Sequence, residues 1–236
     1  MPAAAEGHLG FMDALTQLAP DLWVATRPLK LVVGDIGTRM TVIRLRDGSL
    51  FLHSPVRLDG ETRAALDALG PVRAVVAPSL VHHFYVGEYG AAYPEATLYA
   101  APGLEQKRAD VRFGAVLDDE PPAQWAGQLD QHVFRGAPIM NEVVFFHAAS
   151  RTLLLTDLAF NVVRPMPGRA RFFLRLVNAR GFGPHRIVRF GVRDRVAARA
   201  SLERILQWDF DRVTVTHGEV LDSGGHEAMR TSFDWL

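Results

Sequence analysis

The strongest constraint on the fold is a unit of secondary structure that the sequence repeats. Each copy has a β-hairpin, then a helix, then a buried strand that ends at a histidine-bearing loop. Elements predicted this way depend on hydrophobic period and on turn residues, which are the most reliable local signals. Two copies of one unit in 236 residues predict a domain with two similar halves.

In the first copy, two β-prone runs at 40–53 flank an Asp-Gly pair, which is a strong hairpin signal. Asp59 then precedes an amphipathic segment at 61–69 and can cap it as a helix. The apolar run at 72–77 is typical of a strand that is covered on both faces. His82 follows that strand, and a helix is predicted near 86–93, before another buried strand.

The second copy begins after a Pro-, Gly- and Asp-rich stretch at 102–130, which we interpret as a long surface connection. A hairpin is predicted at 142–156. Asp194 can cap a helix that continues to about Trp208, with Val196, Ala200, Ile205 and Leu206 at helical spacing. The last buried strand, at 212–216, ends at His217.

Hairpins and strands followed by helices favour an α/β protein with a mixed sheet and helices on both sides. Apolar residues make up 48% of the chain, which is enough for a sizeable core. We therefore expect an N-terminal arm at 1–20 and a single domain at 21–236.

Composition excludes several classes of function. The chain has no cysteine, which rules out disulfides, thiolate ligands and a cysteine nucleophile, and fits a cytoplasmic protein. Its formal net charge is zero, so we expect no nucleic-acid partner. No apolar stretch reaches the ~18–20 residues that span a bilayer, so we expect no integral membrane association. The sequence leaves the oligomeric state open.

Arginines are concentrated at 164–199, where Asp194 is the one acidic residue. We favour a structural interpretation, in which Phe and Leu side chains of a helix pack inward and the arginines pair with acids such as Asp118, Asp119 and Glu120. The alternative is a cap over the site that recognises an anion, or a contact with a membrane surface or a partner.

The order of motifs resembles that of the metallo-β-lactamase superfamily over about residues 20–220, and is similar to a branch of unknown function. The resemblance implies a four-layer αββα sandwich. It rests on these phrases: Thr38-Arg39-Met40-Thr41, His53-Ser54-Pro55-Val56-Arg57, Val76-Ala77-Pro78, His82-His83, Tyr99-Ala100-Ala101-Pro102-Gly103, Phe134-Arg135-Gly136 and Leu155-Thr156-Asp157-Leu158.

The metal-binding motif of that superfamily, His-x-His-x-Asp-His, is largely replaced. If Gly87 matches the glycine that follows the motif, then its four ligand positions hold Leu80, His82, Phe84 and Tyr85. His53 or Ser54 stands where an early Asp is expected, and Arg135 lies near the position of a middle His. Asp157 and His217 match the bridging Asp and the last His.

The resemblance thus implies a metal site of His82, Asp157 and His217, with His83 as a fourth ligand or a neighbour. A zinc site needs three or four such N/O ligands. His53, Tyr85 and Arg135 are expected in the pocket. A guanidinium cannot ligate a metal, but Arg135 could take over its charge or bind a carboxylate or phosphate.

Each of these residues also has a structural alternative. His82, His83 and His217 could simply hydrogen-bond at the ends of strands, and Asp157 could cap a turn. We favour a structural role for His53. The other five histidines, His8, His132, His147, His185 and His226, are interpreted as surface or packing residues.

Two hypotheses for function follow. The first is a metal-dependent hydrolase of an ester, amide or phosphoester, with a reduced, mononuclear site for zinc or another divalent metal. The alternative is a metal-free, non-catalytic relative that binds a small-molecule ligand in the same pocket. The sequence contains no nucleophile elbow, Walker loop or dinucleotide fingerprint that would favour other chemistry.

Overall fold

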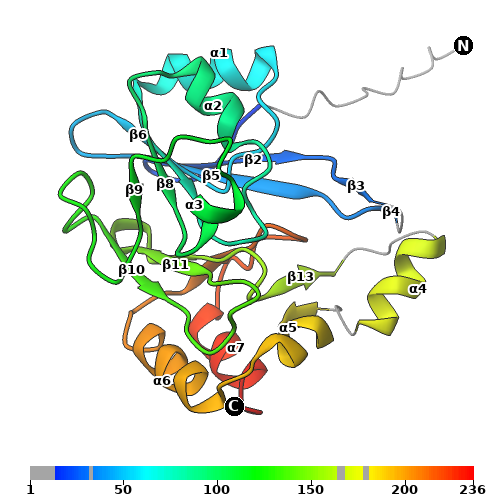
Figure 1. Cartoon of the computed structure of the whole chain (residues 1–236). Coiled ribbons are helices and arrows are strands. Elements are labelled where there is room, and N and C mark those ends of the chain that lie inside the picture. The colour runs from blue at the N-terminus through cyan, green and yellow to red at the C-terminus, as the bar shows by residue number, and fades with distance from the viewer. Residues whose placement is uncertain (1–13, 32–33, 164–167, 178–180) are drawn as a thin grey trace, which may run out of the picture.

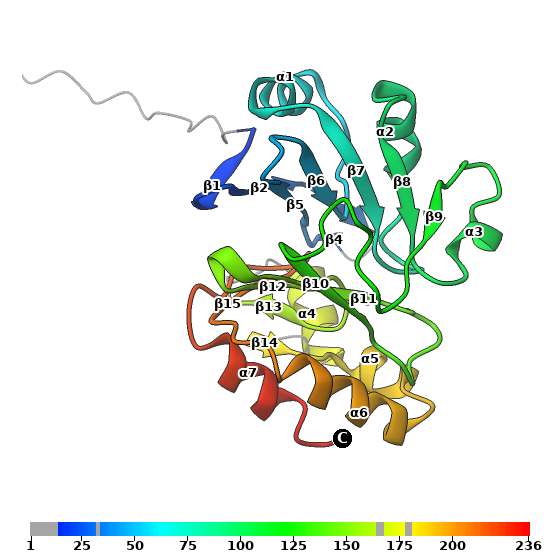
Figure 2. The same ribbon diagram turned by 90° about the vertical axis from the view of Figure 1, so that its left-hand side faces the viewer.

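Two β-sheets lie face to face and carry helices on their outer faces (Figures 1 and 2). The structure is a computed structural model, and it describes residues 14–31, 34–163, 168–177 and 181–236. The four layers follow one another as helices, sheet, sheet and helices in Figure 2. This arrangement confirms the predicted αββα sandwich.

The first sheet has seven strands in the order β1-β2-β5-β6-β7-β8-β9. Its first four strands pair antiparallel, and the pairs from β6 to β9 are parallel. The strands are β1 (Thr16–Ala19), β2 (Leu22–Arg27), β5 (Thr38–Arg44), β6 (Leu50–His53), β7 (Val72–Ala77), β8 (Thr97–Ala100) and β9 (Ala115–Val116).

The second sheet has four strands in the order β10-β11-β12-β15, namely β10 (Leu129–Val133), β11 (Val143–His147), β12 (Thr152–Leu154) and β15 (Arg212–Thr214). The 3-10 turn η1 (Ala148–Ser150) joins its central hairpin. Two small pairs complete the strands: β3 (Lys30–Leu31) with β4 (Gly34–Asp35), and β13 (Phe160–Val162) with β14 (Gly181–Gly183).

Helices α1 (Gly60–Leu69) and α2 (Val86–Ala92) cover the first sheet, and α5 (Arg186–Gly191), α6 (Arg195–Ile205) and α7 (Gly225–Ser232) cover the second. The short α3 (Leu104–Lys107) adds Leu104 to the cluster that α1 and α2 cover. Helix α4 (Gly168–Leu176) stands apart from both layers. Among the described residues, no helix is long and apolar enough to cross a membrane.

The apolar core has three parts, because each sheet buries both faces. On β7, Val75 packs towards α1 and α2, whereas its neighbour Val76 packs between the sheets. Successive side chains of a strand point to opposite faces, so a strand that is buried on both reads as a continuous apolar run. The third part lies between the second sheet and α5, α6 and α7.

Both copies of the repeated unit are present. In each copy, the strand after the helix pairs in parallel with the second strand of the hairpin: β7 with β6, and β15 with β12. The chain therefore has two similar halves. The loops after β7, β12 and β15 all begin at the carboxyl ends of these parallel strands.

Two segments differ from the prediction. Residues 102–130 are not only a surface connection, since they contain α3 and β9 and bury Trp125 completely. The Trp125 ring lies 5.0 Å from that of Phe51 between the sheets. Thr16–Ala19, inside the predicted arm, pairs with β2 as the edge strand β1, and residues 1–13 lie outside the described residues.

Candidate metal centre

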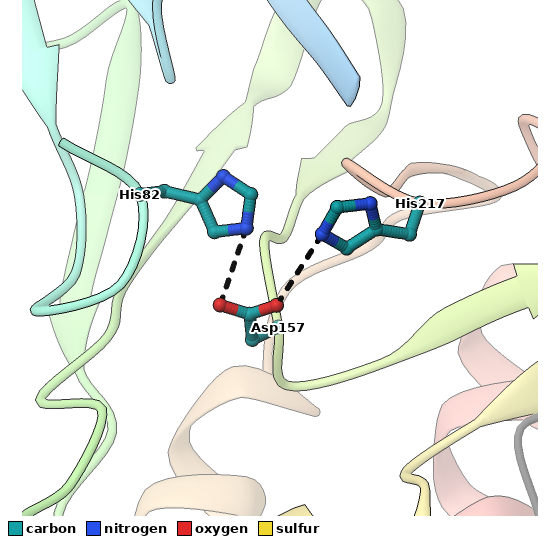
Figure 3. Close-up of side chains that lie close together, drawn as sticks. All are labelled: His82, Asp157 and His217. Carbon is teal, nitrogen blue, oxygen red and sulfur yellow. Dashed lines mark ion pairs between the residues drawn. The ribbon is translucent and has the colours of Figure 1, made fainter. Parts of the chain in front are cut away.

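Three loops bring one side chain each to a common point. His82 follows β7, Asp157 follows β12 and His217 follows β15. One ligand atom of each residue lies within 4.8 Å of those of the other two. Figure 3 shows the two imidazole rings and the carboxylate pointing towards one another.

Asp157 stands between the two histidines. Its Oδ2 lies 3.2 Å from Nε2 of His82, and its Oδ1 lies 3.7 Å from Nε2 of His217. The three residues are buried, with exposed fractions of 4–8%. Even so, neither Nε2 of His82 nor Oδ2 of Asp157 has a hydrogen-bond partner of good geometry. Buried polar atoms are rarely left in this state, and a cation between these atoms would satisfy them.

Two serines hold His82 in place, one through the backbone of its loop and one through its imidazole ring. The buried Ser79 hydroxyl accepts hydrogen bonds from the backbone N–H groups of Val81 and His82. Nδ1 of His82 lies 3.3 Å from Oγ of Ser54. If Nδ1 donates to that hydroxyl, Nε2 keeps its lone pair for a ligand at the site.

The loop of Asp157 is held by a second buried acid. The Glu142 carboxylate accepts hydrogen bonds from the backbone N–H groups of Thr156, Asp157 and Leu158, at 2.6, 2.9 and 2.8 Å. A carboxylate with three such donors fixes the backbone of the loop. Glu142 thereby fixes the position of the Asp157 backbone, from which its carboxylate side chain extends.

His217 is oriented from the other half of the molecule. Its Nδ1 donates to the carbonyl oxygen of Gly37 at 2.7 Å, which leaves the Nε2 lone pair facing Asp157. The next residue, Gly218, has φ +100° and lies so close to Asn161 that a Cβ atom would be 2.1 Å from its carbonyl oxygen. A residue with a side chain does not fit at that position.

Burial and neighbouring charges shift the pKa values of these three groups in opposite directions. Burial opposes a charged imidazole, but the adjacent Asp157 carboxylate outweighs it and raises the pKa of His82. Burial lowers the pKa of His217 to about 4. Burial would raise the pKa of Asp157, but His82 lowers it, so the carboxylate stays ionised. The site therefore combines an anionic oxygen with two imidazoles, a donor set that suits zinc.

His83 does not join the three. Its Nδ1 lies 3.0 Å from Nη1 of Arg108, and a guanidinium can only donate, so Nδ1 accepts and Nε2 carries the proton. In that tautomer His83 has no free lone pair for a metal. His83 lines the cavity. It is therefore a neighbour of the site and not a fourth ligand.

The three expected pocket residues lie in different places. Tyr85 lines the cavity beside the site. The His53 side chain is buried with its ring 5.4 Å from that of Phe145, and burial lowers its pKa to about 3. Arg135 forms an ion pair of 2.7 Å with Asp119 and does not line the cavity, so the structure does not place its charge at the site.

The sequence interpretation missed His185, which the structure places in the cavity wall with 7% of its surface exposed. Its ring lies 4.4 Å from that of Phe160, and its Nδ1 has no hydrogen-bond partner. No local pattern distinguishes His185, because it follows β14, whose pairing with β13 joins segments far apart in the sequence.

The Arg-rich stretch lies partly outside the described residues, at 164–167 and 178–180. Within α4, Phe172 is 71% exposed, so its predicted inward packing is wrong, and Leu176 is 57% exposed. The side chains of Phe173 and Leu174 lie outside the described residues. Of the expected acidic partners, Asp119 pairs with Arg135 and His132, which precede the stretch. The reason is geometric, since α4 stands apart from both helical layers (Figure 1).

A cavity of about 660 Å³ opens beside the three side chains, and they form part of its lining. This volume is in the range of small-molecule sites.

Comparisons with solved structures give metallo-β-lactamases. The enzyme from Erythrobacter litoralis has 15% identity and a TM-score of 0.66, over 97% of this chain and 99% of that chain. The enzyme from Hirschia baltica has 14% identity and a TM-score of 0.60, over 92% and 94%. FIM-1 from Pseudomonas aeruginosa, solved in its mono-zinc form, has 12% identity and a TM-score of 0.64, over 94% of each chain.

A search of curated proteins gives no match. The sequence model of a domain of unknown function, DUF4336, matches residues 21–176, which is more than half of the chain and includes His82 and Asp157. The chain therefore belongs to the DUF4336 family, and it has the metallo-β-lactamase fold.

Proposed function

We propose that this protein binds one divalent metal ion, with zinc the best fit, through His82, Asp157 and His217, and that it hydrolyses a small molecule in the adjacent cavity. The observation that carries the proposal is the group of three buried ligand atoms within 4.8 Å of one another, two of which have no hydrogen bond and only their own 3.2 Å contact. FIM-1 has been solved in a mono-zinc form, so a site with one zinc ion is known on this fold.

A divalent metal at this site would supply Lewis acidity, which activates water and polarises the bond to be cleaved. The chain's own residues hold the ligands ready for it. The Gly37 carbonyl and the Ser54 hydroxyl orient the two imidazoles, and Glu142 fixes the Asp157 loop. Such outer partners contribute to metal affinity because they fix the ligand geometry.

The alternative function is a metal-free module that binds a small molecule in the same cavity. One observation favours it: His83 is engaged with Arg108, so the described residues supply three ligands and no fourth. The two functions make opposite predictions about metal content.

The test is elemental analysis of the purified protein after loading with zinc or manganese. We expect about one metal ion per chain in the wild type and less than about 0.1 in His82→Ala and Asp157→Asn. His83→Ala should keep the metal, and His226→Gln serves as a control at a distant histidine.

A wild-type content below about 0.1 would overturn the metal site and favour the alternative. Full metal content in His82→Ala would show that the ligands are other residues. Loss of metal in His83→Ala but not in His226→Gln would restore His83 as a ligand.

A further inference from the structure

The wall of the cavity is apolar around the metal-ligand group. Beyond the three candidate ligands it is formed largely by side chains such as Leu29, Ile36, Met140, Phe160, Val177 and Val188. Among the described residues that line it, Asp157 is the one Asp, Glu, Lys or Arg. A ligand that fills this space must therefore present mostly apolar surface.

The mouth of the cavity is apolar as well. Four lining residues are large, apolar and exposed: Phe84 at 64%, Ile187 at 49%, Ile139 at 48% and Val81 at 38%. Exposed apolar residues that cluster often mark a binding site, whereas single scattered ones do not. The apolar path thus leads from solvent to the three ligands.

Arg108, the cation that contacts the cavity residue His83, is already paired. Arg108 makes a two-point contact with Asp110 and also donates to the His83 carbonyl. Arg135 pairs with Asp119. Recognition of a phosphate or carboxylate favours Arg or Lys, and the described lining has neither, so an anionic substrate group has no cationic Arg or Lys partner there.

From these observations we propose that the substrate is an ester whose acid part is an uncharged, apolar chain of medium length. The inference rests on the proposed hydrolase function. In the reaction, the water oxygen bonds to the acyl carbon, the acyl C–O bond breaks and the alcohol leaves with a proton. His185, buried in the wall with an Nδ1 that has no hydrogen bond, is a polar group available to contact the ester.

The first experiment compares p-nitrophenyl acetate with p-nitrophenyl octanoate on the zinc-loaded protein. We expect kcat/KM to rise at least about tenfold with the longer chain, because each methylene that leaves water can contribute up to about fourfold. Bis(p-nitrophenyl) phosphate should be cleaved at least about 100-fold more slowly than the octanoate. Metal-free protein gives the background rate.

Variants at the mouth test the location. Phe84→Asp and Ile187→Asp place a charge where the chain would pass, and should lower kcat/KM for the octanoate at least about tenfold but that for the acetate less than about twofold. Both side chains are about half exposed or more, so neither is needed for the core. Val116→Asp is the matched control, at an apolar residue that is 47% exposed and does not line the cavity.

A binding measurement separates this inference from the proposed function. The neutral fluorescent probe N-phenyl-1-naphthylamine should bind metal-free protein and be displaced by decan-2-one but not by inorganic phosphate. If the probe binds but the zinc-loaded protein cleaves no ester, the hydrolase proposal is overturned and the apolar ligand class still stands. Equal cleavage of both esters, with no probe binding, would overturn the ligand class and leave the hydrolase standing.

Discussion

Glu142 is the residue on which the geometry of the candidate metal centre most depends. Burial and the nearby Asp157 carboxylate raise its pKa to about 7, while three backbone N–H donors favour its ionised form. Two buried carboxylates stay close together here because one has the backbone donors and the other has His82 and His217. Glu142 is therefore a positioning residue for Asp157.

Substitution Glu142→Gln tests this role, because Gln replaces one acceptor oxygen with an amide that cannot accept from the loop. We expect zinc affinity to fall about 10- to 100-fold with all three ligands present, and stability to fall by about 1–3 kcal/mol. Competition with a zinc chelator and urea unfolding give the two values. Glu203→Gln, on the exposed side of α6, is the control. Wild-type zinc affinity in Glu142→Gln would refute the positioning role.

At the scale of elements, both capped helices begin where the sequence predicts, but the inward face of one is only partly the predicted one. The side chains of Asp59 and Asp194 accept from backbone N–H groups in the first turns of α1 and α6. In α6, Ile205 is buried and Leu206 packs on the same cluster, as predicted, but Val196 is 82% exposed and Ala200 is also exposed. The other buried positions of the helix are Ala198, Ser201 and Leu202. The Gly136 carbonyl accepts from the backbone at Arg193 and Asp194, and this distant contact sets the rotation of the helix.

The cap of α1 predicts a dependence of stability on pH. Partial burial would raise the pKa of Asp59, but Arg27 and the backbone N–H of Thr62 lower it to about 2. Since this pKa is lower than the usual 3.8, the stabilisation by the Asp59 charge is complete above pH 3.8 and is lost as the pH falls towards 2.

Asp59→Ala should lose about 1 kcal/mol of stability at pH 7, and Asp59→Asn should lose less because its side-chain oxygen still caps the helix. Urea unfolding at pH 7 and at pH 3 measures both effects. The stability difference between wild type and Asp59→Asn should shrink at pH 3. A difference that grows at pH 3 would contradict the assigned sign.

At the scale of the whole molecule, the halves share one core. Phe51 and Val76 of the first sheet pack in the same cluster as Phe145 and Leu154 of the second. The buried Arg39 on β5 also donates to the Val215 carbonyl beyond β15, at 2.6 Å. Neither half could expose its inner face to water without losing a large apolar contact.

We therefore expect one cooperative thermal transition for the chain, with equal calorimetric and van't Hoff enthalpies. Differential scanning calorimetry of the metal-free protein measures both. Two separate transitions, or a van't Hoff enthalpy well below the calorimetric one, would show that the halves unfold independently. That result would also refute the single domain predicted at 21–236.

Much of the candidate site could be predicted from sequence, because three of its residues follow predicted strands. The resemblance to the metallo-β-lactamase superfamily selected His82, Asp157 and His217 from the polar residues at such positions. It could not decide the direction of side chains on loops. His83 turns to Arg108, Arg135 turns to Asp119, and His185 enters the cavity, each through a contact that no local pattern encodes.

The sequence by itself determined the two hairpin, helix and strand units and the positions of the helix caps. These features depend on hydrogen bonds and hydrophobic periods within a few residues. Only the tertiary structure decided that the three loops meet, how α6 is rotated and that the cavity beside the ligands is apolar. Those outcomes depend on contacts such as that between His217 and Gly37, which are 180 positions apart in the chain, and the chain must fold before such groups meet.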